Sequence, residues 1–225
     1  MKTGFAIAID GPGGVGKSTA AKIVARELGI THIDTGAMYR AVALYQIENG
    51  ISLHNAVSLE ESLENIHIEL INTDGLQKIF LNGRDVSDLI RTSEASEGAS
   101  LVAANLKVRE KLAAHQKETA ANGRVIMDGR DIGSHVLPWA QVKIYLDAPP
   151  EVRATRRAKE LSEKNQPADY EQILSEINER DTRDKSREHS PLIQTADAIY
   201  LNTAQYKTPE ETAEAIIKIA REKGM

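Results

Sequence analysis

The stretch Gly11-Pro-Gly-Gly-Val-Gly-Lys-Ser18 follows the apolar run at residues 5–10 and matches the pattern G-x-x-x-x-G-K-[ST]. Its glycines allow backbone N–H groups to converge on phosphate oxygens, Lys17 can reach the β- and γ-phosphates, and the Ser18 hydroxyl can bind Mg²⁺. Residues 18–28 place apolar side chains at helical spacing and stop at a glycine, which favours helix C-termini. The order strand, loop, helix predicts a phosphate-binding site, because a helix N-terminus attracts anions. The alternative is a glycine-rich turn without a ligand.

Length and composition narrow the class of protein. The 225 residues are 41% hydrophobic, which is enough for one sizeable α/β core in a single domain, 1–225. The chain has no cysteine, which excludes disulfides, thiolate zinc sites and a thiol nucleophile and suits a reducing compartment. No window approaches about 18 consecutive apolar residues, and the net charge of −5 disfavours long nucleic acids. We therefore expect a cytoplasmic protein that binds neither membrane nor nucleic acid.

The order of the predicted elements indicates an α/β fold. Helical patterns separate five strand candidates, at residues 5–10, 30–33, 124–128, 142–147 and 198–202. Such alternation predicts a parallel sheet covered by helices, with ligands at the carboxyl ends of the strands. The loop at Gly11, the segment Asp34-Thr-Gly36 and the segment Asp128-Gly-Arg-Asp131 would all lie at that edge.

A long excursion between the second and third strands interrupts this rhythm. Two short strand patterns, 66–72 and 76–81, flank the turn signal Thr73-Asp-Gly75 and predict a small antiparallel sheet. A capping box, Ser58-x-x-Glu61, predicts a short helix before it, and the ranges 93–105 and 106–121 predict helices after it. We interpret the excursion as an inserted subdomain.

Beyond the fourth strand, two helices at 151–164 and 169–187 flank a polar break, and Thr208 is expected to cap the last helix.

Arginines cluster beside the predicted site. Thr35 is the expected N-cap of a helix that aims Tyr39 and Arg40 at the cleft, although a surface arginine is an equally simple interpretation. Asp128 ends an apolar strand, where it would be a second residue on the metal side. Arg130 and Asp131 follow directly, as part of the same charged run between glycines.

Two later helices carry further charges. Arg180, Asp184 and Arg187 share one helix face, with Arg183 adjacent, and either recognise a base and sugar or form an exposed face of ion pairs. The spacing i, i+3, i+4 puts three further arginines on one basic helix face, namely Arg153, Arg156 and Arg157. This face is either part of a lid over a triphosphate or a solvated surface. The six histidines share no metal-ligand spacing, and we interpret all of them as structural or surface residues.

Taken together, the loop G-P-G-G-V-G-K-S-T and the motifs D-T-G-A-M-Y-R, V-R-E, M-D-G-R-D-I-G and E-R-D-x-R-D-x-x-R resemble the bacterial cytidylate kinases, a family of nucleoside monophosphate (NMP) kinases. The likeness spans nearly the whole chain. It implies a P-loop NTPase fold with a core (1–34, 106–150 and 169–225), an NMP-binding insert (35–105) that carries the small sheet, and a short lid (151–168). One departure is Trp139, where the family more often has aspartate, and we interpret it as a surface contact.

The resemblance also implies roles for individual residues. Lys17, Arg130 and Arg157 would be catalytic, and Ser18 and Asp128 would hold Mg²⁺. ATP would be bound by Arg157 and by the loop residues Gly11, Pro12, Gly13, Gly14, Val15, Gly16, Lys17, Ser18 and Thr19. The phosphate of CMP would be held by Arg40, Arg109 and Arg130, and the other substrate-binding residues would be Thr35, Tyr39, Ser100, Asp131, Arg180, Asp184 and Arg187.

The expected function is ATP-dependent phosphorylation of CMP and dCMP by in-line transfer, with Mg²⁺ as cofactor and the protein as a monomer. A phosphate acceptor is already anionic, so no general base is required. One alternative is a kinase of a metabolite hydroxyl, with Asp34 or Asp128 as base. Another is a nucleotide-dependent switch or regulatory ATPase whose insert binds a partner protein.

Overall fold

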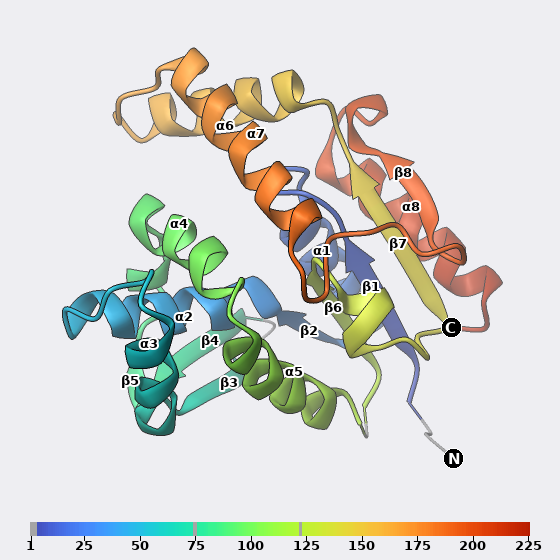
Figure 1. The fold of residues 1–225 in the computed structure, drawn as a ribbon. Coiled ribbons are helices and arrows are strands. Elements are labelled where there is room, and N and C mark those ends of the chain that lie inside the picture. Colours follow the sequence, from blue (N-terminus) through green and yellow to red (C-terminus); the bar gives the residue numbers. More distant parts are fainter. Residues whose placement is uncertain (1–3, 74–75, 122) are drawn as a thin grey trace.

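A five-stranded parallel sheet forms the centre of the chain in the computed structural model, which describes residues 4–73, 76–121 and 123–225 (Figure 1). Its order is β2-β6-β1-β7-β8, and every pairing between neighbours is parallel. The strands are β1 (Ala6–Asp10), β2 (Thr31–Asp34), β6 (Val125–Gly129), β7 (Val142–Asp147) and β8 (Ile199–Asn202). Each lies within one residue of its predicted range, which confirms the α/β prediction.

Helices cover both faces of this sheet. On one face, α1 (Lys17–Leu28) and α8 (Pro209–Glu222) pack against alternate strand residues such as Ile7 and Ile9. On the other face, α5 (Leu106–Ala120) contributes to a cluster that contains Ala6 and Ala8. Because β1 is buried on both sides, its sequence is a continuous apolar run that ends in Asp10.

The insert packs around a second hydrophobic cluster, which it shares with Val108 and Leu112 of α5. Its antiparallel sheet consists of β3 (Ile68–Thr73), β4 (Leu76–Leu81) and β5 (Arg84–Asp85), which confirms the predicted small sheet. The predicted turn at residues 73–75 lies partly outside the described residues. Three helices pack with these strands: α2 (Thr35–Glu48), α3 (Ala56–Ser62) and α4 (Ser93–Val102).

Three predicted helix boundaries in the insert are wrong. Asp34, not Thr35, caps α2, because its extended backbone lets its carboxylate accept the Ala37 N–H at 3.0 Å. Asn55, not Ser58, caps α3 by accepting the Ser58 N–H at 3.2 Å. Helix α4 ends at Val102, earlier than residue 105, because Asn105 turns to cap α5.

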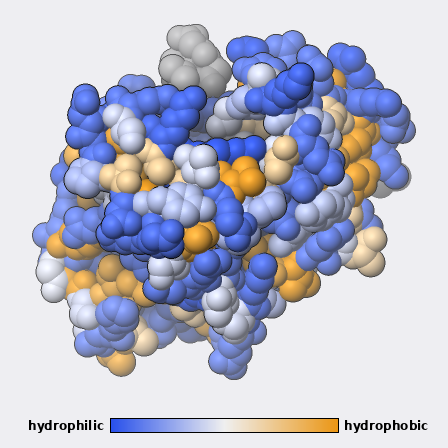
Figure 2. Space-filling view, turned by 90° about the horizontal axis from the view of Figure 1, so that it is seen from above, coloured by the Kyte–Doolittle hydropathy of each residue, from blue (hydrophilic) through white to orange (hydrophobic). Residues whose placement is uncertain are grey.

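Beyond β7, helices α6 (Pro150–Glu163) and α7 (Tyr170–Ser186) pack side by side, and α7 also contacts α4 of the insert (Figure 1). Pro150 occupies the first turn of α6, and Thr208 caps α8 as predicted. Viewed from above, the molecule is mainly hydrophilic, with smaller hydrophobic areas among the charged residues (Figure 2). Among the described residues, no helix combines the length and apolarity that crossing a membrane requires.

We predict that Gly11→Ala lowers the free energy of unfolding by about 3 kcal/mol or more. Gly11 has φ +150°, and a Cβ there would lie 2.0 Å from the Leu146 carbonyl oxygen of β7. Gly50→Ala is the matched control, since Gly50 also has a positive φ of 66° but nothing lies within 4 Å of its Cβ position. It should lose only about 1 to 2 kcal/mol. Equal losses in urea unfolding would contradict the proposed close approach of β1 and β7.

Candidate active site

A cavity of about 310 Å³ opens at the carboxyl ends of β2 and β6, next to the glycine loop. Side chains and backbone from the loop, the insert, β6 and α7 line it. The predicted site residues that it brings together are Gly13, Gly14, Gly16, Lys17, Ser18, Thr19, Thr35, Tyr39, Arg40, Ser100, Arg109, Asp128, Arg130, Asp131, Arg180, Asp184 and Arg187. Gly11, Pro12, Val15 and Arg157 are not among its lining residues.

The backbone amides at the start of α1 are able to bind an anion. Gly16 precedes the helix in a left-handed conformation, and no side chain caps this end. The first amide to bond within the helix is that of Ala20, to the Gly16 carbonyl, so the amides before it have no helical acceptor. A helix N-terminus with free N–H groups attracts phosphate.

Lys17 lies folded against its own loop. Its ammonium donates to the carbonyls of Gly11 at 2.7 Å and Pro12 at 2.6 Å. Burial and the charge of Arg130 lower the pKa of Lys17 well below its ordinary value. These two loop residues therefore act through Lys17, whereas Val15 is 1% exposed and belongs to the hydrophobic core.

Ser18 and Asp128 are in direct contact at the start of α1. The Ser18 hydroxyl donates to Asp128 at 2.6 Å, and His32 contacts the other carboxylate oxygen at 2.6 Å. Burial opposes ionisation of Asp128, but the contacts with His32 and Ser18 outweigh it and hold the pKa of Asp128 below its ordinary value. Within the described ranges, no cluster of three or more His, Asp or Glu residues could hold a metal. A hydroxyl and a carboxylate still suit Mg²⁺, which usually takes one or two protein oxygens together with phosphates and water.

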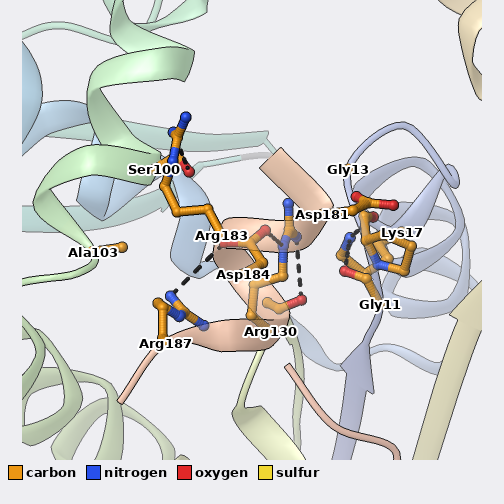
Figure 3. A network of polar contacts seen from close by, with 12 residues as sticks. Gly11, Gly13, Lys17, Ser100, Ala103, Arg130, Asp181, Arg183, Asp184 and Arg187 are labelled. Carbon is orange, nitrogen blue, oxygen red and sulfur yellow. Dashed lines mark hydrogen bonds and ion pairs between the residues drawn. The ribbon is translucent and has the colours of Figure 1, made fainter. Parts of the chain in front are cut away.

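Carboxylates hold the arginines of the cavity in place (Figure 3). Arg130 donates to Asp184 at 2.8 Å, and Arg40 donates to Asp34 at 3.0 Å. Arg109 pairs with Asp131 and lies over the ring of Tyr39, 5.6 Å from its centre. Tyr39 is half-buried, and desolvation raises the pKa of its hydroxyl to about 12. The hydroxyl of Thr35 donates to the backbone carbonyl of Asp128 at 2.7 Å.

Positive charge nevertheless exceeds negative charge here. Among the described residues that line the cavity, six are cationic and four are carboxylates. Burial and the neighbouring Arg130 lower the pKa of Arg180 to about 10, and burial and Arg109 lower that of Arg187. The Nε atoms of Arg109, Arg180 and Arg187 are buried without a partner among the described residues. An anionic ligand with several acceptors would relieve both the repulsion and the missing hydrogen bonds.

The predicted basic face on α6 is wrong. Arg153 is 2% exposed and binds Asp181 of α7 at 2.5 and 3.1 Å, together with the carbonyl of Gly13 at 3.1 Å. Arg156 turns toward Thr203, while Arg157 pairs with Glu160 at 3.0 Å. Residues three and four apart share a face, but here different neighbours draw the side chains in different directions. Arg157 lies on a second cavity, of about 670 Å³, between α4, α6 and α7.

Two buried residues of the site were missed in the sequence. Asp10 accepts the amides of Ile132 and Gly133, both at 2.7 Å, and so fixes the turn that carries Arg130 and Asp131. Burial raises the pKa of Asp10 to about 6. Its place at the end of a wholly apolar strand was the available signal. His32, interpreted as structural or surface, lies buried against Asp128.

A third missed residue connects the small sheet to the site. Gln77 of β4 accepts the backbone amide of Asp34 at 2.9 Å. The same aspartate caps α2 and binds Arg40, so the sheet helps to hold the base of the arginine cluster. Nothing in the local pattern around Gln77 indicates this contact.

The chain is similar to known proteins over nearly its full length. Residues 7–222 match a family model described as cytidylate kinase. A cytidylate kinase of Fervidobacterium nodosum is 46% identical over 96% of both chains, and one of Lysinibacillus sphaericus is 47% identical over 99% of both. The crystal structure of an uncharacterized protein from Eubacterium ventriosum has a TM-score of 0.52 at 11% identity, covering 97% of this chain and 98% of that one. That last likeness concerns the fold alone.

We predict that the Asp10 carboxyl makes folding less favourable as the pH rises from about 4 to about 6. Its folded pKa of about 6 lies above the ordinary 3.8, so between these values the folded state holds a proton that the unfolded state has lost. The contribution lost amounts to about 3 kcal/mol. Urea unfolding across this range measures it as the difference between wild type and Asp10→Asn, which lacks the titrating group. Parallel stability profiles would contradict the raised pKa.

Proposed function

The chain belongs to the cytidylate kinase family, and we propose that it transfers the γ-phosphoryl group of ATP to CMP and dCMP in the cavity described above. The observation that carries this proposal is the meeting of two kinds of phosphate site in one cavity. One is the loop with the start of α1, and the other is the arginine cluster from α2, α5, α7 and the turn after β6. A kinase whose acceptor is itself a phosphate needs both.

On the donor side, the amides at the start of α1 and the ammonium of Lys17 hold the ATP phosphates. Lys17 now donates to two loop carbonyls, and it exchanges these for phosphate oxygens when ATP binds. Ser18 and Asp128 would hold Mg²⁺, which would neutralise part of the charge on the phosphates. Arg157 stands on the second cavity, from which it approaches the donor when the region 151–168 closes as a lid.

On the acceptor side, Arg40, Arg109 and Arg130 bind the phosphate of CMP. Arginine suits this role because its planar fork binds phosphate bidentately and stays charged. Each of the three is already held by a carboxylate, so the cluster is organised before the substrate arrives. The remaining groups, Thr35, Tyr39, Ser100, Asp131, Arg180, Asp184 and Arg187, surround the base and ribose.

The chemical step is then mainly electrostatic. A CMP phosphate oxygen attacks the γ-phosphorus in line, and this nucleophile is an anion without help from a base. The surplus of cations offsets the repulsion between the two substrates. A kinase of a neutral hydroxyl would need a free carboxylate as base, but Asp34 is paired with Arg40 and Asp128 with Ser18 and His32. A cytoplasmic location and a monomeric state remain our predictions.

The direct test is a coupled assay for ADP formation from Mg-ATP, with CMP, dCMP, UMP, AMP, GMP and no acceptor measured in parallel. Strong turnover with CMP and dCMP supports the proposal. ADP formation that needs no acceptor would instead identify an ATPase or switch, and activity with hydroxyl acceptors alone would identify the other type of kinase.

We predict that Lys17→Ala reduces phosphoryl transfer to CMP below detection, because Lys17 is the one charged residue within the loop 11–18. Lys22→Ala is the matched control, since Lys22 lies exposed on the same helix. Steady-state kinetics with CMP should show normal turnover for the control. Substantial transfer by Lys17→Ala would remove this lysine from the donor site.

We also predict that Asp184→Ala weakens the use of cytosine nucleotides by roughly 1 to 3 kcal/mol, or about 5- to 150-fold in kcat/KM. Asp184 is buried and is held by Arg130, so its loss leaves an arginine and a substrate group without their acceptor. The assay compares CMP, UMP and AMP. An unchanged preference among the three would exclude Asp184 from recognition of the base or the sugar.

A further inference from the structure

Arg183 makes a contact that spans the site from α7 to the insert. Its Nη1 donates to the hydroxyl of Ser100 on α4 at 3.0 Å and to the carboxylate of Glu97 at 2.8 Å (Figure 3 shows the first contact). Ser100 is 3% exposed and lines the cavity, whereas Arg183 itself does not line it. Arg183 therefore reaches the substrate cavity only through the serine.

The chemistry of this contact makes the Ser100 hydroxyl the acceptor. A guanidinium has donors and no acceptor, so in this pair Ser100 must accept. Its own proton then points away from Arg183. Among the described residues, no protein group accepts a hydrogen bond from this hydroxyl. Because Ser100 lines the cavity, this donor is available to a ligand bound there.

We propose that Arg183 is a specificity-determining positioning residue, which sets the Ser100 hydroxyl as a hydrogen-bond donor to the pyrimidine base. The proposal rests on the function proposed above. Cytosine offers an unprotonated ring nitrogen, N3, as acceptor, whereas N3 of uracil carries a hydrogen. A hydroxyl proton held opposite N3 donates to cytosine and is repelled by the N3–H of uracil. Without Arg183 the hydroxyl is free to rotate and offers a lone pair to either base.

The contact with Glu97 provides the necessary control. The side chains of Arg183 and Glu97 are 28% and 53% exposed, and an ion pair so open to water contributes little to stability. If Arg183 acted through its ion pair with Glu97, Glu97→Gln would reproduce the effect of its removal. If it acts through Ser100, Glu97→Gln keeps the kinetics of the wild type within about twofold.

The experiment measures steady-state kinetics with CMP and UMP for five proteins: wild type, Arg183→Met, Ser100→Ala, the double variant and Glu97→Gln. Arg183→Met should lower the ratio of kcat/KM for CMP over UMP by roughly tenfold through KM for CMP. Arg183 also lines the second cavity, on which Arg157 lies, but its hydrogen bonds go to Glu97 and Ser100 rather than to the glycine loop. KM for ATP should therefore change by less than about twofold. In the Ser100→Ala background, removal of Arg183 should have no further effect on the ratio.

Arg183→Lys is the conservative variant, because an ammonium is also a pure donor, and it should retain part of the discrimination. Effects of Arg183→Met and Ser100→Ala that multiply, or a Glu97→Gln variant that matches Arg183→Met, would overturn the proposal. An unchanged CMP to UMP ratio in Arg183→Met would do the same. Wild-type protein without CMP-dependent ADP formation would instead refute the proposed function, which keeps the two failures distinct.

Discussion

Several positive charges are buried together in one cavity, and the surrounding contacts hold and partly neutralise them. Lys17, Arg130 and Arg180 lie close enough for their charges to lower the pKa of Lys17 and Arg180. Such a group is costly to hold together without counter-charges. The buried carboxylates Asp131 and Asp184 supply part of the compensation, and the substrate phosphates would supply the rest. The repulsion between these cations thus favours the binding of an anion.

The central sheet and the insert each position part of the arginine cluster. Asp10 at the end of β1 fixes the turn that bears Arg130, and Gln77 of the small sheet holds the backbone of Asp34 beneath Arg40. Arg153 joins α6 to α7 through Asp181 and also contacts the glycine loop. Through Asp34, the small sheet thus supports the position of Arg40 in the arginine cluster. Since the insert and α7 both carry arginines, their relative position sets the geometry of the cluster.

Much of this architecture was predictable from periodicity. The five parallel strands, the helix after the loop and the small antiparallel sheet each follow from local apolar spacing and turn residues, and most predicted site residues meet in one cavity. The failures concern contacts between distant segments. Helical spacing placed Arg153 and Arg157 on one face of α6, but it does not reveal that Asp181 of α7 binds Arg153. It equally conceals the partners of His32 and Gln77, and the choice of Asp34 over Thr35 as a cap depends on one backbone angle.

The central claim is that this cluster binds the phosphate of an acceptor nucleotide. Isothermal titration of the protein with CMP and with cytidine, without ATP, tests it most directly because the two ligands differ only in that phosphate. With two or more charge-assisted hydrogen bonds at stake, the account predicts that cytidine binds at least about 100-fold more weakly than CMP. Affinities for CMP and cytidine within about threefold of each other would show that the arginines do not bind the acceptor phosphate, and would contradict the account.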